Sequence, residues 1–155
     1  MVRELKITPI KNGTVIDHVT SGLALEVLRI IGASNLDKES TVSVALHVRS
    51  RRMGWKDIVK VENMELSAQK INAIALLSPT ATISIIRDFK VVEKRPVTLP
   101  DRFTGVLKCP NPNCITNKGE PVEPDFEVVR RRPLALRCLF CDRYVDDFLP
   151  HLNTR

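Results

Sequence analysis

Four cysteines in two close pairs constrain this chain more than any other feature of its sequence. Cys109 and Cys114 lie in the stretch CPNPNC, Cys138 and Cys141 lie in CLFC, and 23 residues separate the two pairs. Two thiolate pairs in tight turns, converging from separate segments, are the usual form of a structural zinc site. The prolines and asparagines of the first pair favour such a turn. We therefore expect all four sulfurs to bind one Zn²⁺ ion.

Two other uses of the cysteines are open at this stage. Iron accepts the same ligands, and spacing does not exclude it. Two disulfides would need an oxidising compartment, whereas charges interrupt the N-terminal stretch MVRELKITPIKNG before any apolar core of a signal peptide can form. We expect a cytoplasmic protein, and no membrane association, because no apolar run approaches the ~20 residues of a membrane span.

The positive charge is concentrated in the first two thirds of the chain. Residues 1–100 carry 15 Lys and Arg against 10 Asp and Glu, whereas residues 101–155 carry 9 against 8. A zinc ribbon that binds nucleic acid usually carries the positive charge itself. The charge therefore favours an anionic ligand on the first part. A zinc-ribbon protein that binds nucleic acid remains the alternative, supported by the triplet Arg130-Arg131-Arg132 and by a pI of ≈ 9.4.

The stretch RPVTLPD (Arg95–Asp101) contains two prolines and predicts a linker between domains at 1–96 and 102–155. In the first domain, helices should run from a cap at Thr20 or Ser21 to Gly32, and from Ser67 to just before Pro79. Strands are expected at Glu4–Ile10, Thr14–Val19, Thr41–Arg49, Asp57–Val61, Thr82–Ile86 and Phe89–Val92. This order contains βαββαβ, the ferredoxin-like arrangement, in which two helices cover one face of a sheet.

The second domain should be a small antiparallel β domain held by the metal, so the fold class is α+β. Its expected strands lie at Gly105–Lys108, Phe126–Arg131, Leu134–Arg137 and Tyr144–Leu149. Two further details of the first domain can be checked. Strict alternation should place Val42, Val44, Leu46 and Val48 on one face of their strand, and Trp55 should lie in a loop.

No catalytic motif stands out in the sequence, which has no HExxH, no phosphate-binding loop and no nucleophile elbow, so we do not expect an enzyme. The pair Asp17-His18 could read a ribose or a base. Because strand neighbours face opposite sides of a sheet, both can serve one ligand only at a strand end or a bulge. Lys60 interrupts an apolar strand, and Lys94 follows Val91-Val92-Glu93 at a strand end; each lysine either extends to an edge or faces an anion.

The chain closely resembles the regulatory chain of aspartate carbamoyltransferase over nearly its full length. The resemblance rests on GTVIDH (Gly13–His18), KDIVKVEN (Lys56–Asn63), LSPTATISII (Leu77–Ile86), VVEKRPVTLPDR (Val91–Arg102) and the two cysteine motifs. It implies a non-catalytic subunit of pyrimidine biosynthesis. An N-terminal domain would bind the nucleotide effectors CTP and ATP, and the zinc domain would bind the catalytic chain.

The resemblance also implies roles for single residues. Asp17 would contact ribose, His18 and Lys94 the phosphates, and Lys60 the ribose or base. The matching positions of the base pocket are Ile10, Val15, Ser84, Phe89 and Val91. The four cysteines match the zinc ligands, and the catalytic chain would be contacted by Asn111, Asn113, Asp142 and Arg143. The strand around Thr41–Arg49 would pair two regulatory chains as a homodimer.

Some positions depart from the family. Well-known bacterial members have a lysine where this chain has Glu4, with Lys6 as a possible substitute, and an asparagine where it has Ser84. Thr8 and Pro9 also differ from the acidic and small residues found there. The resemblance therefore leaves open which nucleotides inhibit and which activate.

Overall fold

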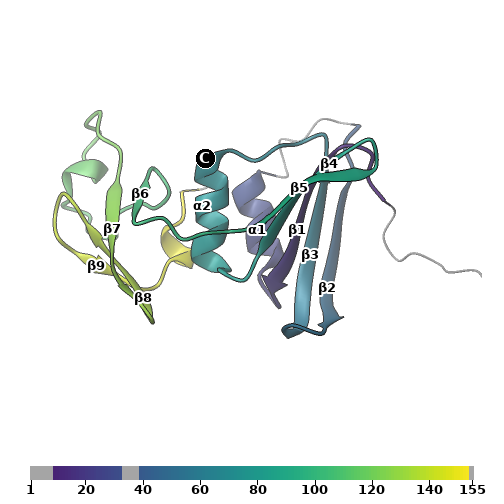
Figure 1. Ribbon diagram of the computed structural model, residues 1–155. Helices are drawn as coiled ribbons and strands as arrows, with labels where there is room; N and C mark the ends of the chain where they lie inside the picture. The colour runs from purple at the N-terminus through teal and green to yellow at the C-terminus, as the bar shows by residue number, and fades with distance from the viewer. Residues whose placement is uncertain (1–8, 33–38, 154–155) are drawn as a thin grey trace, which may run out of the picture.

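The computed structural model describes residues 9–32 and 39–153, and it forms two β-sheets with two α-helices between them (Figure 1). The first sheet has five strands in the order β2-β3-β1-β4-β5. Its elements are β1 (Gly13–Thr20), α1 (Ala24–Ile31), β2 (Val42–Ser50), β3 (Gly54–Glu62), α2 (Ala68–Leu77), β4 (Thr82–Arg87) and β5 (Lys90–Pro96). All neighbouring strands are antiparallel. This confirms the predicted α+β class and the βαββαβ order, with β5 added at the edge.

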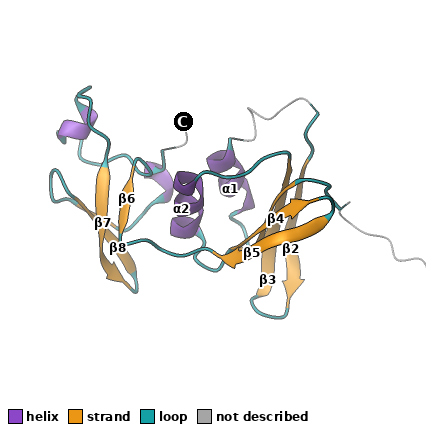
Figure 2. Cartoon of the chain, turned by 45° about the horizontal axis from the view of Figure 1, so that its top comes forward, coloured by secondary structure: helices purple, strands orange, loops and turns teal. Residues whose placement is uncertain are grey.

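Both helices cover the same face of this sheet and lie side by side in the two views (Figures 1 and 2). The side chains between the layers are apolar: Ile16, Val59 and Val61 are fully buried, and Ile83 is 2% exposed. Because side chains alternate along a strand, the residues between these positions lie on the opposite face, which no helix covers. That uncovered face of the five-stranded sheet is called the open face below.

The second sheet has four strands in the order β6-β7-β8-β9. Its strands are β6 (Arg102–Thr104), β7 (Asp125–Arg131), β8 (Leu134–Cys138) and β9 (Tyr144–Val145). Phe103, Phe126 and Leu136 are fully buried in it. The helix α2 lies between the two sheets (Figure 1), and the Gln69 side chain donates a hydrogen bond to the carbonyl of Thr104 at 3.3 Å. One apolar cluster therefore continues from the first region into the second.

The start of α1 differs from the sequence prediction. Neither Thr20 nor Ser21 caps it: its N-cap is Leu23, which makes no side-chain cap bond. The buried carboxylate of Asp57 instead accepts hydrogen bonds from the backbone N–H groups of Gly22 (2.9 Å) and Ala24 (3.1 Å). A helix start can thus be stabilised by an acidic residue more than 30 positions away, which local pattern does not reveal.

Bulges in β1 and β2 also break the expected alternation. In β2, Ala45 pairs with Ile58 and Val48 with Lys56, so that two residues of β2 oppose the single residue Asp57. The extra residue moves Val48 to the opposite face from Val44, which pairs with the buried Val59. The prediction that all four apolar residues of this strand share one face is therefore wrong.

Several predicted strand limits are also corrected. Of the strand expected at Glu4–Ile10, residues 4–8 lie outside the described residues, and Pro9 and Ile10 are not in a strand. Phe89 belongs to the turn before β5, and Trp55 lies in β3 rather than in a loop. In the second region, Gly105–Lys108 is not a strand, and the last strand ends at Val145. Turns and bulges set by backbone geometry, such as the positive φ of Phe89, explain these differences.

Candidate functional site

Four of the predicted ligand-binding residues form one row across the open face. Val15 of β1 pairs with Lys60 of β3 on one side and with Ser84 of β4 on the other. Ser84 in turn pairs with Lys94 of β5. Directly opposite side chains on one face lie about 4.5–5.5 Å apart at Cβ. The row therefore has one ammonium group at each end, from Lys60 and Lys94, with the valine and the serine hydroxyl between them. Val15 and Lys94 lie far apart in the sequence, and only the pairing of the strands brings them into one row.

The pair Asp17-His18 lies in the bulge that its joint use requires. Ile16 pairs with Val59 and Val19 with Asp57, so both residues oppose a single residue of β3. His18 has a positive φ of 54°, and its Nδ1 lies 3.1 Å from Oγ1 of Thr82, which pairs with Asp17 across β1 and β4. The imidazole and the carboxylate therefore both lie beside Thr82 at the end of the open face.

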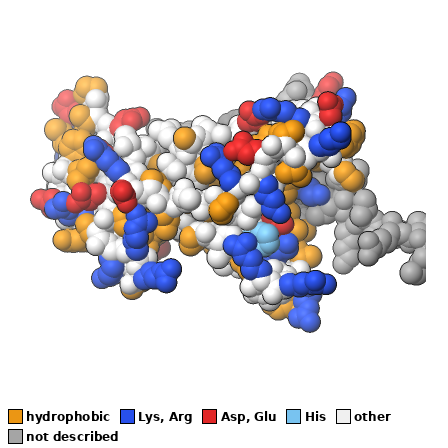
Figure 3. Space-filling model, viewed as in Figure 1, with side chains coloured by type: hydrophobic (Ala, Val, Ile, Leu, Met, Phe, Trp, Pro, Cys, Tyr) orange, Lys and Arg blue, Asp and Glu red, His pale blue; other side chains and the backbone are white. Residues whose placement is uncertain are grey.

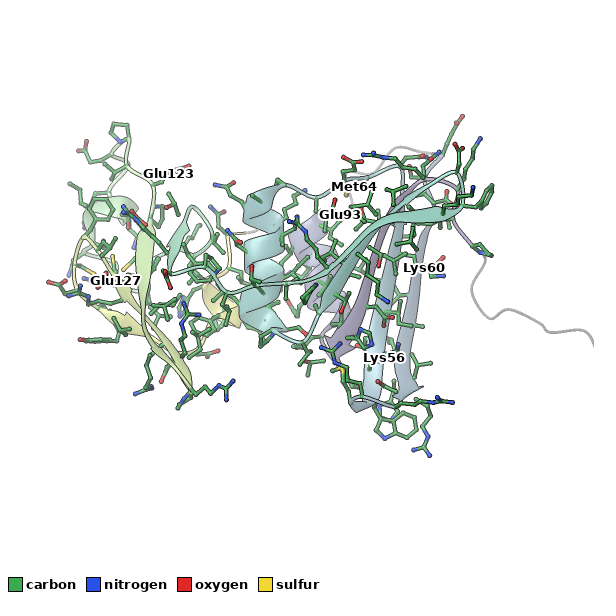
Figure 4. The ribbon with its side chains drawn as sticks, in the orientation of Figure 1. Lys56, Lys60, Met64, Glu93, Glu123 and Glu127 are labelled. Atoms are coloured by element: carbon green, nitrogen blue, oxygen red, sulfur yellow. The ribbon has the colours of Figure 1, made fainter. Side chains whose placement is uncertain are left out.

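Lys56 completes this end of the site. Its Nζ lies 2.9 Å from Oδ1 of Asp17, which also accepts a hydrogen bond from the backbone N–H of His18 at 2.6 Å. Figure 4 shows Lys56 and Lys60 following one another along β3. The sequence analysis did not single out Lys56 or Thr82. The sequence could have indicated Lys56, because residues four apart in a strand share a face, as Lys56 and Lys60 do.

The charges around the bulge set the protonation of both groups. Burial opposes ionisation of Asp17, but the hydrogen bonds from Lys56 and from the His18 backbone outweigh it and hold the pKa of this carboxyl below its usual value. Burial lowers the pKa of His18, Asp17 opposes that shift, and the positive charges of Lys56, Arg52 and Lys94 add to it. His18 is therefore neutral at pH 7 in a positive field, a setting that favours an anion.

Three of the apolar residues predicted for a base pocket, Ile10, Phe89 and Val91, lie at the other end of the sheet from His18, whereas Val15 lies in the row. Ile10 is 5% exposed, and the backbone N–H of Phe89 donates to the carbonyl of Lys11 at 2.9 Å, which joins the segment before β1 to the β4–β5 turn. Val91 pairs with Ile86, and Phe89 and Val91 are exposed. The predicted positions Glu4, Lys6 and Thr8 lie outside the described residues.

The four cysteines gather in the second region, within 4.8 Å of one another at their sulfur atoms. The Sγ atoms of Cys109 and Cys141 are 3.5 Å apart, and those of Cys114 and Cys138 are 3.8 Å apart. A tetrahedral zinc ion with Zn–S bonds of about 2.3 Å separates its sulfurs by about 3.8 Å. All four cysteines are free thiols, so the predicted alternative of two disulfides does not hold.

Hydrogen bonds within the chain shape both cysteine turns. The Asn117 side chain donates to the carbonyls of Cys109 (2.9 Å) and Asn111 (2.7 Å), which closes the first turn. In the second turn, the N–H of Cys138 donates to the carbonyl of Arg143, and the N–H of Asp142 donates to that of Cys138, both at 2.9 Å. Burial raises the pKa of the Cys109 and Cys138 thiols, so thiolates there need a bound cation. The donor set fits a closed metal site with four sulfur ligands.

The residues predicted to contact a partner surround these turns. Asn111 is half-buried, and its Oδ1 accepts the N–H of Asn113 at 3.0 Å, so its side chain also shapes the turn. Asn113, Asp142 and Arg143 are exposed. Exposed apolar side chains lie close in sequence to the ligands: Ile115, Leu139, Phe140 and Tyr144. A contact surface at this position remains a prediction.

Comparison with known protein families identifies the chain's relationship. Residues 5–98 match the family model described as the aspartate carbamoyltransferase regulatory chain, allosteric domain. Residues 101–148 match the model for the metal binding domain of the same regulatory chain. The chain belongs to the aspartate carbamoyltransferase regulatory chain family. It is therefore a regulatory, non-catalytic chain with an allosteric and a metal-binding domain.

Several members of this family are about half identical in sequence to this chain over nearly its full length. The regulatory chain of Methanoculleus marisnigri is 52% identical over 151 residues, which cover 97% of this chain and 95% of that protein. The regulatory chain of Methanothermobacter thermautotrophicus is 51% identical over 143 residues, covering 92% and 90%. That of Pyrococcus furiosus is 49% identical over 144 residues, covering 93% and 94%. None of the helices in residues 9–32 and 39–153 has the length and apolar character needed to cross a membrane.

Proposed function

We propose that this chain binds the nucleotide effectors CTP and ATP on the open face and controls a catalytic chain of aspartate carbamoyltransferase. The row of Lys60, Val15, Ser84 and Lys94, continued by the Asp17-His18 bulge, carries this proposal. It supplies ammonium groups and a neutral imidazole for phosphates, and a carboxylate for ribose hydroxyls. Ile10, Phe89 and Val91 would line the base.

In this arrangement the nucleotide spans the sheet from one end to the other. The base would lie at the β4–β5 turn and the phosphates between His18 and Lys94. Lys60, near the middle of the row, would contact ribose or base. Ser84 is buried between Val15 and Lys94, so its hydroxyl lies within the row rather than at its rim. This line of charged and polar groups supports a nucleotide as the ligand, and the departures at Glu4 and Ser84 bear on which base is preferred.

Calorimetric titration of the zinc-loaded chain with CTP and ATP tests this proposal. We expect one saturable site, and Lys94→Ala should weaken it at least tenfold, since a hydrogen bond to a charged group contributes about 1.5–3 kcal/mol. Lys90→Ala is the matched control, because Lys90 lies on the same strand but pairs with Arg87 outside the row. An equal effect of both variants, or no saturable binding, would refute the proposal.

We further propose that one structural Zn²⁺ ion organises the surface that binds the catalytic chain. Asn111, Asn113, Asp142 and Arg143 lie in or beside the two cysteine turns, so loss of the ion would disorder them together. Chelator treatment of the assembled complex should release this chain, as size-exclusion chromatography would show. A complex that stays assembled after its zinc has been removed would contradict this part of the proposal.

The two domains would divide at 1–96 and 102–155, and effector binding would act through the linker between them. Val97 is bound to the first domain, since its N–H donates to the carbonyl of Ala81 at 3.0 Å. Asp101 is bound to the second, since its carbonyl accepts the N–H of Val128 at 2.9 Å. We propose that the hinge lies between these two residues, where the carbonyl of Leu99 accepts a hydrogen bond from Arg131 at 3.4 Å. Effectors would act by differential affinity for two quaternary states, typically ~1–3 kcal/mol.

A homodimer of regulatory chains would form at β2, an outer strand of the five-stranded sheet. Its outer backbone groups are available for antiparallel pairing with a second copy. Sedimentation of the zinc-loaded chain at several concentrations tests dimer formation directly. The cytoplasmic location stays a prediction.

A further inference from the structure

The end of the β2–β3 hairpin forms a cationic cavity that the proposed function does not use. A cavity of about 480 Å³ is lined by Arg49, Ser50, Arg51 and Gly54. We call these four residues the hairpin cup. Figure 3 shows Lys and Arg side chains gathered at this end of the sheet. Its volume lies within the range of about 300–1,000 Å³ of small-molecule sites, so it has room for more than one phosphoryl group.

Stacking holds one wall of the cup in place. The guanidinium carbon of Arg49 lies 5.0 Å from the centre of the Trp55 ring. Trp55 in turn stacks on His47, with ring centres 4.1 Å apart and planes 10° from parallel. The Nδ1 of His47 lies 2.9 Å from Oγ of Ser21, at the start of the α1 segment. Arg49 is thus oriented by a column of aromatic rings before any ligand arrives.

The β2 bulge produces this column. His47 has a positive φ of 54°, and its backbone N–H donates to Oδ1 of the buried Asp57 at 2.8 Å. The same register shift places Arg49 opposite Trp55. A regular strand would have turned the ring of His47 to the other face, away from Trp55.

The positive charge of the cup is not neutralised by neighbouring residues. Within residues 9–32 and 39–153, neither Arg49 nor Arg51 makes an ion pair, whereas Arg87 pairs with Glu65 and Arg102 with Asp125. Ser50 accepts the N–H of Met53 at 3.2 Å, and its hydroxyl proton remains free to donate. The cup therefore offers donors and positive charge without a carboxylate competitor.

We propose that the hairpin cup binds a multiply charged phosphate anion. The planar guanidinium forks of two arginines match phosphate oxygens in pairs, and a hydroxyl adds a third donor. Because no carboxylate among the described residues pairs with Arg49 or Arg51, the cup favours a ligand with several negative charges. This site is separate from the row of Lys60, Val15, Ser84 and Lys94, which is called the nucleotide row below. Trp55 and Arg49 share the face of Asp57, towards the helices, whereas Lys56 contacts Asp17 on the open face.

Dimer formation along β2 would leave the cup available. Edge pairing uses backbone N–H and carbonyl groups, whereas the Arg49 side chain projects from a face of β2 and Arg51 lies in the turn beyond that strand. The inference is therefore independent of the proposed nucleotide function. Its anion could be a free oligophosphate or the phosphate chain of a nucleotide, and the experiment below distinguishes the two.

Calorimetric titration of the full zinc-loaded chain with inorganic tripolyphosphate tests the inference. We expect saturable binding that Arg49→Gln weakens about tenfold, the loss of one charge-assisted contact. Arg132→Gln removes the same charge from the metal-binding domain and should leave affinity unchanged. Trp55→Leu, which keeps every charge, should weaken binding severalfold, whereas Trp55→Phe should retain it because the stack persists. If Arg49→Gln does not fold, Arg49→Lys keeps the charge and removes the fork.

A second arm uses Lys94→Ala to remove binding in the nucleotide row. Tripolyphosphate binding that persists in this variant supports a separate cup, and parallel titration with ATP then shows whether a nucleotide phosphate chain also enters it. The inference is overturned if tripolyphosphate does not bind, if Lys94→Ala abolishes its binding, or if Arg49→Gln and Arg132→Gln have equal effects. Equal affinity of the wild type and Trp55→Leu would likewise overturn it.

Discussion

The five-stranded region and the four-stranded region of this chain differ in what holds each together. The first buries a continuous apolar layer between its sheet and two helices, including Ile16, Val59 and Ile83. The second has few large buried side chains, notably Phe103, Phe126 and Leu136, and instead gathers four thiols. A region of about 50 residues is marginal without such help. The first region should therefore fold by hydrophobic burial, and the second by binding its metal.

The two candidate sites differ in the same way. Each half of the metal site is made by residues a few positions apart, so short turns bring the ligands together. The nucleotide row is made by single residues from four strands, and only the register of three strand pairs makes them neighbours. A site built from local turns tolerates changes elsewhere in the chain, whereas a site built by register depends on every bulge between its strands.

Cys138→Ser should have the largest effect and should separate the two regions. We expect hydrogen-exchange protection to disappear from β6 to β9 and to persist in β1, β3 and β4. The expected loss is several kcal/mol, because structural zinc contributes apparent free energies of about 10–16 kcal/mol in zinc-finger peptides. Thr116→Val is the control, since it removes only the hydrogen bond to Sγ of Cys114. Loss of protection throughout the chain would show instead that both regions fold as one unit.

Asp57→Ala tests whether the first region depends on burial alone. Its carboxylate accepts three backbone N–H groups, from Gly22, Ala24 and His47, and is fully buried. Leaving these donors unsatisfied should destabilise the first region by about 3 kcal/mol or more in urea unfolding. Asp57→Asn, which keeps one acceptor oxygen, should lose less. Asp146→Ala, at an exposed position of the second region, is the control, and a comparable loss there would contradict this interpretation.

The pH dependence of nucleotide binding tests whether His18 on the open face contacts the phosphates. The pKa of His18 is lowered in the free chain, by burial first and then by nearby positive charges. A bound phosphate would raise that pKa, so binding takes up a proton and affinity should increase severalfold as pH falls from 7.5 to 6. His18→Gln should remove this increase while leaving any contribution from the ligand's own phosphate. A pH profile that is unchanged in the variant would exclude His18 from phosphate binding.

Asp17→Asn should have the smallest effect. The pKa of Asp17 is lowered in the folded chain, so the pair with Lys56 stabilises the fold above the pKa of the unfolded carboxyl. That stability is lost as pH falls through the folded pKa. We expect thermal unfolding at pH 7 to show a loss of about 1 kcal/mol or less. The difference from wild type should vanish once pH falls below the folded pKa of Asp17, and a difference that stays constant with pH would show that charge is not its cause.

Much of the fold could be predicted from the sequence because its signals are local. The cysteine spacing predicted the metal site, Gly32 ends α1 with its φ of 79°, and Ser67 caps α2 by accepting the N–H of Lys70. Alternating apolar residues located most strands of the first region. The predictions were wrong where a residue distant in the sequence makes the hydrogen bonds expected of a local one. At the start of α1, for example, Asp57 rather than Thr20 or Ser21 accepts the free backbone N–H groups.

The sequence by itself determined the two-domain order, the cluster of four cysteines and the family, since each rests on residue types at short spacings. Only the tertiary structure decided which side chains share a site. The register of β1, β3, β4 and β5 placed Lys60 beside Val15 and Ser84 beside Lys94. Two bulges, opposite Ile58 and Asp57, set the faces of His18 and His47. One extra residue in a strand reverses every later side chain, and its cost depends on partners that lie far away in the sequence.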